Sequence, residues 1–197
     1  MNVKKMITGL ALSMLMSSGM VAADYYDGLQ AYNSGDFKTA LAEWTPLAEQ
    51  GNASAQYNLG VMYHKGQGVL KSDKTAVKWF SLSGEQGHAA AQYNLSIMYN
   101  KGEGVLKNDK TATKWNALAA ENGNVEAQFF AGGRFEFGMG SLIDTKRAYM
   151  WYSIAAYNGS DDGLEYRDSI AKKMTPTQID KAQDMSSRCL KSNYTDC

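Results

Sequence analysis

The sequence predicts an all-α protein, a solenoid of stacked helix hairpins that ends in a helical cap. The main observation is an internal repeat of 36 residues, which recurs at three sets of positions: Gln56, Gln92 and Gln128; Trp79, Trp115 and Trp151; and Gly66, Gly102 and Gly138. Self-similarity at this period is typical of arrays in which each unit buries its apolar face against its neighbours. We therefore expect a repeated unit to organise the chain, rather than one catalytic pocket.

The spacing within one unit predicts two helices. Small and apolar residues four apart form one stripe on a first helix, at Ala55, Leu59 and Tyr63. A second stripe, at intervals of three and four, predicts the second helix: Ala76, Trp79, Phe80 and Ser83. The tryptophans of this stripe are expected in the core.

Glycines and an aspartate predict where these helices end. Gly66 is placed to end the first helix in a left-handed conformation, Asp73 to N-cap the second, and Gly87 to end it. Gly60 falls inside the first helix, where glycine costs about 1 kcal/mol relative to alanine. Its use there indicates that a neighbouring helix approaches closely.

The unit resembles the Sel1-like repeat, a relative of the tetratricopeptide repeat with a longer loop between its helices. The three copies read AQYNLGVMYHKGQGVLKSDKTAVKWF, AQYNLSIMYNKGEGVLKNDKTATKWN and AQFFAGGRFEFGMGSLIDTKRAYMWY. Ser96 replaces the helix glycine and Asn116 an aromatic residue, and Asp144 comes one place earlier than Asp73 and Asp109 predict. We interpret these departures as local loop adjustments. The resemblance covers roughly residues 24 to 190 and implies a right-handed α-solenoid.

The N-terminus has the pattern of a cleavable secretory signal. Lys4 and Lys5 precede an apolar run over residues 6–21, and Val21, Ala22 and Ala23 are small residues of the kind that a signal peptidase reads. The alternative is a membrane anchor, but the run is short of the ~20 apolar residues that a span needs. We expect cleavage after Ala23, a periplasmic or secreted protein, and no membrane insertion after cleavage.

These observations predict a division of the chain into a signal, an atypical first hairpin, three full repeats and a C-terminal cap. The expected ranges are 1–23 for the signal, 24–51 for the atypical hairpin, 52–87, 88–123 and 124–159 for the repeats, and 160–197 for the capping helices and tail. Pro46 falls within the second helix of the first hairpin and predicts a kink or a late start. Thr175, Pro176 and Gln178 predict a capping box that begins the last helix.

Cys189 and Cys197 are the two cysteines of the chain, with seven residues between them. In an oxidising compartment we expect a disulfide that holds the tail against the last helix, with two free thiols as the alternative.

Neither catalysis nor a cofactor is indicated by the sequence. His64 and His88 are too far apart for a metal site, and we expect both at the surface. The Gly-rich loops lack the strand and the Lys-Ser/Thr of a phosphate loop. The chain has 20 basic and 20 acidic side chains, so no charge excess indicates nucleic acid or anionic lipid as a partner.

Two functional hypotheses remain. The first is a module that binds a protein or peptide on the concave face; by resemblance to tetratricopeptide arrays, the first helices would line that face through Tyr57, Val61, His64, Tyr93, Ile97, Asn100, Phe129, Gly133 and Glu136. The tyrosines and the phenylalanine of this set would, as an alternative, stack between repeats. The second hypothesis is an enzyme or ligand-binding protein, of the kind that resembles penicillin-interacting, cysteine-rich Sel1-like proteins. Those proteins carry a cysteine pair within each repeat, which this chain lacks.

Overall fold

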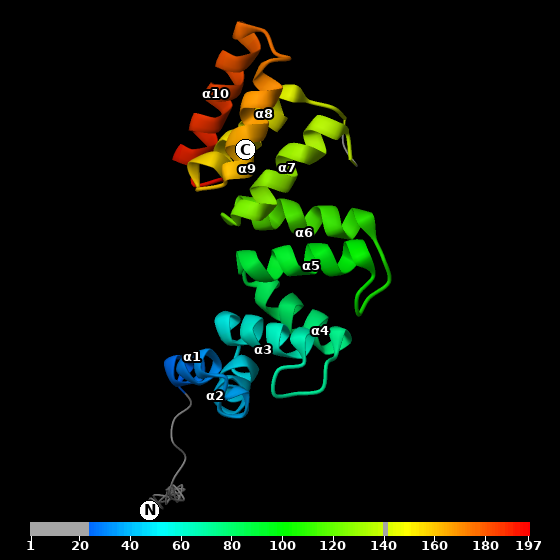
Figure 1. Cartoon of the computed structure of the whole chain (residues 1–197), viewed down its shortest axis with the longest axis vertical. Helices are drawn as coiled ribbons and strands as arrows, with labels where there is room; N and C mark the ends of the chain where they lie inside the picture. The colour runs from blue at the N-terminus through cyan, green and yellow to red at the C-terminus, as the bar shows by residue number, and fades with distance from the viewer. Residues whose placement is uncertain (1–23, 140–141) are drawn as a thin grey trace, which may run out of the picture.

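The computed structural model describes residues 24–139 and 142–197, which form ten α-helices and no strand (Figure 1). The expected signal segment 1–23 lies outside the described residues. The helices are α1 Tyr25–Ser34, α2 Phe37–Glu49, α3 Ala53–Lys65, α4 Asp73–Glu85, α5 Ala89–Lys101, α6 Asp109–Glu121, α7 Val125–Phe137, α8 Thr145–Tyr157, α9 Asp161–Ala171 and α10 Pro176–Lys191.

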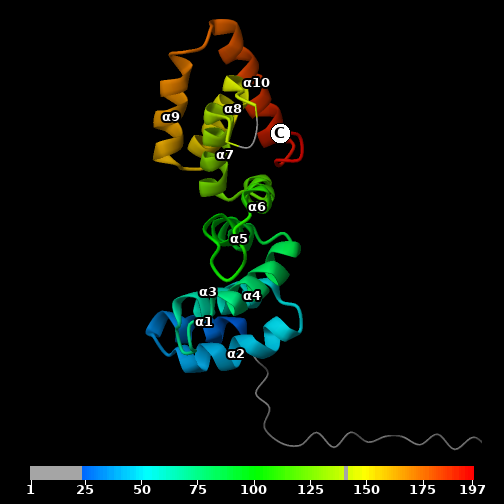
Figure 2. The same cartoon turned by 90° about the vertical axis from the view of Figure 1, so that its right-hand side faces the viewer.

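The helices stack as antiparallel hairpins along one axis. Each odd-numbered helix from α1 to α7 pairs with the helix that follows it, and each second helix then packs against the first helix of the next hairpin. The hairpins succeed one another from α1 at one end to the cap at the other (Figures 1 and 2). Helix α8 also packs against α9 and α10, which close that end. The prediction of an all-α solenoid is confirmed.

The second helices begin one residue earlier than we predicted. Ser72, not Asp73, N-caps α4, since its hydroxyl accepts a hydrogen bond from the Thr75 N–H at 3.2 Å. The caps of α6 and α8 are Asn108 and Asp144. These three caps are 36 residues apart, so Asp144 is in phase with the repeat and the apparent shift disappears. The expected late start at Pro46 is also wrong, because α2 begins at Phe37 and continues through the proline.

In three of the four hairpins, a deeply buried aromatic residue directly follows the position of the repeated tryptophan; the α5–α6 hairpin has Asn116 there. Trp44 is 1% exposed, Phe80 1% and Tyr152 0%. Trp151 is buried as expected, but Trp79 and Trp115 are only half-buried. Their position therefore borders the core in the first two full repeats instead of filling it.

A buried glutamine joins each full repeat to the hairpin before it. Gln92 donates from Nε2 to the Gly84 carbonyl at 2.8 Å, and its Oε1 accepts from Asn122 Nδ2 at 3.0 Å. The equivalent side chains, Gln56 and Gln128, make the same two kinds of bond. Since a buried amide without partners is costly, these bonds explain why glutamine recurs at a buried position.

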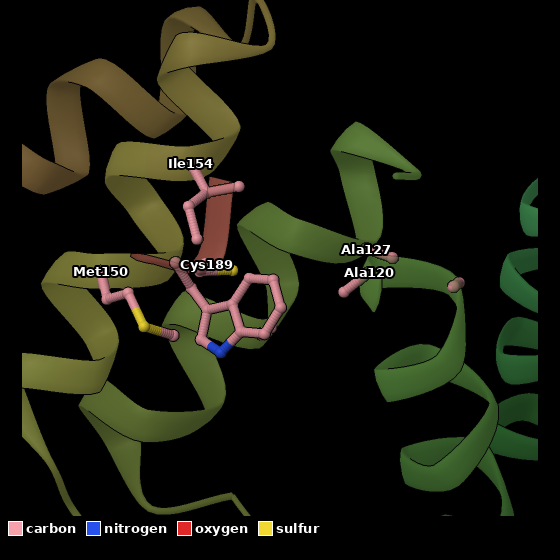
Figure 3. Close-up of a cluster of buried hydrophobic side chains, with 8 residues drawn as sticks. Ala120, Ala127, Met150, Ile154 and Cys189 are labelled. Atoms are coloured by element: carbon pink, nitrogen blue, oxygen red, sulfur yellow. The ribbon is translucent and has the colours of Figure 1, made fainter. Parts of the chain in front are cut away.

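The C-terminal cap is covalently closed. The predicted disulfide joins Cys189 of α10 to Cys197, and Cys189 lies beside Met150 and Ile154 of α8 (Figure 3). The capping box at Thr175 and Gln178 is present and confirms the predicted start of α10. The tail thus covers the last repeat.

Candidate interaction face

The first helices of the hairpins, α1, α3, α5 and α7, together with α9, form one face of the array, which we call the first-helix face. Helices α3 and α5 contact each other directly, although α4 lies between them in the chain. Eight of the nine predicted site residues are half-buried, and Asn100 is exposed: Tyr57, Val61, His64, Tyr93, Ile97, Phe129, Gly133 and Glu136 form the half-buried set. A partner could therefore contact only part of the surface of each of these eight residues.

Two of the predicted aromatic residues pack against the buried ring on the second helix of their own hairpin. The ring of Tyr57 lies 5.8 Å from that of Phe80, and Phe129 lies 5.6 Å from Tyr152. Val61 borders the same cluster as Phe80. These contacts lie within one repeat, so they differ from the stacking between repeats that we considered as the alternative for these rings.

The same aromatic positions also link consecutive hairpins. In the first half of the array the link is polar: Asn58 Nδ2 donates to the Tyr25 hydroxyl at 3.2 Å, and the Asn94 side chain hydrogen-bonds to Tyr57. In the second half the position of Asn58 and Asn94 is occupied by Phe130. The face therefore changes from polar to aromatic along its length.

The aromatic half forms a continuous row of rings across three helices. Tyr93 of α5 stacks on Phe130 of α7 at 6.2 Å, and Phe130 meets Phe129 at 5.7 Å. Phe129 then meets Tyr166 of α9 edge-on at 5.2 Å. We call these four residues the aromatic row. Phe130 is 49% exposed and Tyr166 40%, so two of the four rings face solvent.

Sequence reasoning missed Phe130 and Tyr166. The signal for Phe130 was available, because it is a large apolar residue where the first two full repeats carry asparagine. Tyr166 lies in the cap, outside the repeat, so no comparison between repeats could identify it.

The last predicted position of each full repeat makes a polar contact of its own. His64 Nδ1 lies 2.8 Å from Asp73 Oδ1, and Asn100 Nδ2 donates to Asp109 at 3.5 Å. Glu136 accepts from the Tyr152 hydroxyl at 2.9 Å and pairs with a lysine of the cap. The contacts of His64 and Asn100 tie the two ends of a hairpin loop together. His64 lies in the last turn of α3 with its side chain 36% exposed, a helix-end position at the surface as expected.

His88 is half-buried at the start of a helix. It N-caps α5, accepting from the Ala91 N–H at Nδ1 over 3.3 Å, and its ring stacks on Tyr57 at 4.6 Å. Burial lowers the pKa of His88. Burial likewise raises the pKa of Tyr57 and of Tyr93, so these groups favour their neutral forms.

The described part of the chain shows neither a cluster of metal ligands nor a helix able to span a membrane. Within residues 24–139 and 142–197, no three His, Cys, Asp or Glu side chains come together as metal ligands. In the same ranges, no helix combines the length and apolar character needed to cross a membrane. Two hollows, of about 440 and 600 Å³, lie away from the first-helix face; their lining residues are Lys146, Asp180, Lys181, Asp184, Met185 and Arg188 for the first and Glu121, Asn122, Asn193, Tyr194, Thr195 and Cys197 for the second.

Comparison with known proteins identifies the repeat. The sequence model of the Sel1 repeat matches residues 53–88, 89–124 and 125–160, more than half of the chain. The chain is similar to the crystal structure of a protective antigen from uropathogenic Escherichia coli that displays this repeat fold, with 32% identity, a TM-score of 0.73 and coverage of 86% of this chain and 38% of that one. It is also similar to a Sel1 repeat protein from Oxalobacter formigenes, with 28% identity, a TM-score of 0.67 and coverage of 87% and 78%. No curated protein sequence matches it.

Proposed function

We propose that this chain, which belongs to the Sel1 repeat family, is a periplasmic or secreted interaction module that holds a protein segment or a peptide along its first-helix face. Sel1 repeat proteins generally act as protein–protein interaction modules. In this proposal the first-helix face is the inner curve of the array, which the direct contact between α3 and α5 supports.

The aromatic row carries the proposal. Phe130 and Tyr166 remain substantially exposed although each contacts other rings. Aromatic side chains are enriched at protein interfaces and among the few residues that dominate the binding energy there. Folding does not require this exposure, because the first two full repeats place asparagine where Phe130 stands.

The change in polarity along the face suggests how a partner lies on it. The Tyr25–Asn58 and Tyr57–Asn94 pairs offer hydrogen-bonding groups at one end. The aromatic row offers apolar surface at the other. An extended segment with a polar half and an apolar or aromatic half would match both.

Export is the other part of the proposal. The disulfide between Cys189 and Cys197 is of the kind that persists in an oxidising compartment. Export with cleavage after Ala23 predicts that the exported protein begins at Asp24, which N-terminal sequencing tests directly. An exported protein that still begins at Met1 would contradict this part of the proposal.

Peptide selection with site-specific crosslinking tests the binding face. Residues 24–197 would be used to select peptides from a random display library, and a photoreactive benzoyl-phenylalanine would then replace Ile97 on α5 or, as the control, Leu82 on α4. Ile97 is half-buried on the first-helix face, and Leu82 is exposed on a second helix. We expect crosslinks to the selected peptides from position 97 alone. Crosslinks from position 82 alone would assign binding to the other face.

A further inference from the structure

An exposed leucine recurs at the same place in the loop of each full repeat. Leu70 is 91% exposed, Leu106 92% and Leu142 90%, and they are 36 residues apart. In the third repeat Ile143 is also exposed, as are Phe137 and Met139 at the end of α7. Side chains this exposed protrude from the surface and contribute little to the core.

The loops after α3 and α5 lie at equivalent places along one edge of the array. A β-carbon at Gly68 would lie 2.8 Å from Phe37 Cβ, and one at Gly104 would overlap the carbonyl of Asp73. Each of these two loops therefore rests on the start of the second helix in the preceding hairpin. The loop after α5 leaves the right-hand side of Figure 1, the side turned toward the viewer in Figure 2.

The basic side chains of the repeats gather in the segments that contain the loops of the three full repeats, where 11 Lys and Arg residues outnumber 5 Asp and Glu residues. Every Lys and Arg between residues 52 and 160 falls in three segments, 65–78, 101–114 and 134–147, each of which contains a loop and the adjoining helix ends. The intervening segments, 79–100 and 115–133, contain glutamates and neither Lys nor Arg. The equal totals of basic and acidic side chains therefore conceal a segregation of the two along the repeats.

Helix stability does not explain this segregation. Lys74, Lys110 and Lys146 are the second residues of α4, α6 and α8, where the positive end of the helix dipole disfavours a cation. Glu85 and Glu121 end α4 and α6, where the negative end disfavours an anion. Within the described residues, Lys74 and Lys110 form no ion pair that would offset this cost.

We propose that this loop edge, comprising residues 65–78, 101–114 and the described residues of 134–147, docks peripherally on an anionic phospholipid bilayer. The lysines match the negative charge of the lipid headgroups, and the protruding leucines enter the interfacial region between them. A lipid interface can accept three separate protruding leucines wherever they lie. A folded protein partner would need a separate pocket for each leucine, at the spacing of the repeat. Docking in this way requires no membrane-spanning helix, and it leaves the first-helix face free.

Vesicle co-sedimentation tests the proposal with residues 24–197. We expect binding to vesicles of phosphatidylcholine mixed with phosphatidylglycerol, weakening with salt, and none to phosphatidylcholine alone. The double variant Leu70→Ser/Leu106→Ser should lower the partition coefficient by about tenfold. The double variant Lys74→Gln/Lys110→Gln should lower the partition coefficient to a similar degree. It should also make the partition coefficient less dependent on salt.

Leu82→Ser/Leu118→Ser is the matched control. These leucines are also 36 residues apart and are 37% and 41% exposed, but they lie on α4 and α6 beside the glutamates. The control should bind vesicles like the parent, and all variants should keep the parent's circular dichroism spectrum. An absence of binding to the anionic vesicles, or equal losses in the control and the loop variants, would overturn the proposal. The proposal would also be overturned if the parent were a dimer and the Leu70→Ser/Leu106→Ser variant a monomer, since the loop edge would then bind a second copy of the chain.

Discussion

A β-carbon on Gly60 would lie 2.5 Å from Cδ1 of Phe80, so the buried Phe80 ring occupies the space that a side chain at position 60 would need. The same relationship joins Gly28 to Trp44 and Gly132 to Tyr152. In the second full repeat the two equivalent positions carry Ser96 and Asn116, so both departures fall on one contact between helices. Their interpretation as loop adjustments is wrong.

Gly60→Ala should therefore destabilise the protein. Overpacking costs about 1–3 kcal/mol, against which the better helix propensity of alanine returns about 1 kcal/mol. We expect a net loss of free energy of unfolding in urea denaturation. Ser96→Ala is the matched control and should cost less, since a β-carbon is already present there and the change removes only the hydrogen bond from the Ser96 hydroxyl to the Tyr93 carbonyl. Equal stability of Gly60→Ala and the parent would contradict the assigned contact.

Restoring the missing pair should stabilise the second full repeat. Asn116 Oδ1 is buried and has no hydrogen-bond partner within the described residues, a state that costs about 1–3 kcal/mol. Ser96→Gly combined with Asn116→Phe should raise the free energy of unfolding above that of the parent. Asn116→Phe alone should gain less, because the Ser96 β-carbon obstructs the ring. A double-mutant cycle with a coupling energy below about 0.5 kcal/mol would show that the two positions are independent.

His88 should make stability depend on pH on the acid side of neutrality. Burial lowers its pKa from the usual 6.5, so the folded state favours the neutral ring. The stabilisation is complete above pH 6.5 and is lost as the pH falls through the lowered pKa, because protonation also removes the acceptor that caps α5. His88→Asn, which copies the caps Asn52 and Asn124, should remove this part of the pH dependence. Parallel melting-temperature curves against pH for the two proteins would refute the assignment.

Opening the disulfide should loosen the cap and leave the repeats folded. A loop this short contributes roughly 2–3 kcal/mol in the chain-entropy estimate. A reductant should therefore lower the melting temperature of the parent to that of Cys197→Ser. The same reductant should leave Cys197→Ser unchanged. If maleimide labels two thiols in the unreduced parent, the bridge is absent from the protein in solution.

The repeat made most of the fold predictable, because core positions return every 36 residues and Gln92 or Leu95 can be checked against its copies. Such comparison identifies what all units share. It could not find the paired role of Ser96 and Asn116, which depends on knowing that the two helices cross there. It does show that Phe130 differs from Asn58 and Asn94, but a difference between copies does not by itself distinguish a binding residue from a neutral change. The phase error at Asp73 arose because Ser72 and Asp73 are both suitable caps, and only the backbone geometry decides between them.

The most direct test of the proposed function is the affinity of a selected peptide for Phe130→Asn. This variant gives the third full repeat the residue that the first two already carry, so we expect it to fold like the parent. Fluorescence anisotropy with the labelled peptide should show a dissociation constant at least about tenfold higher, a loss of roughly 1.4 kcal/mol. Leu118→Asn, which alters a comparably exposed leucine on α6, should leave the affinity unchanged. Unchanged affinity in a folded Phe130→Asn variant would contradict binding on the aromatic row of the first-helix face.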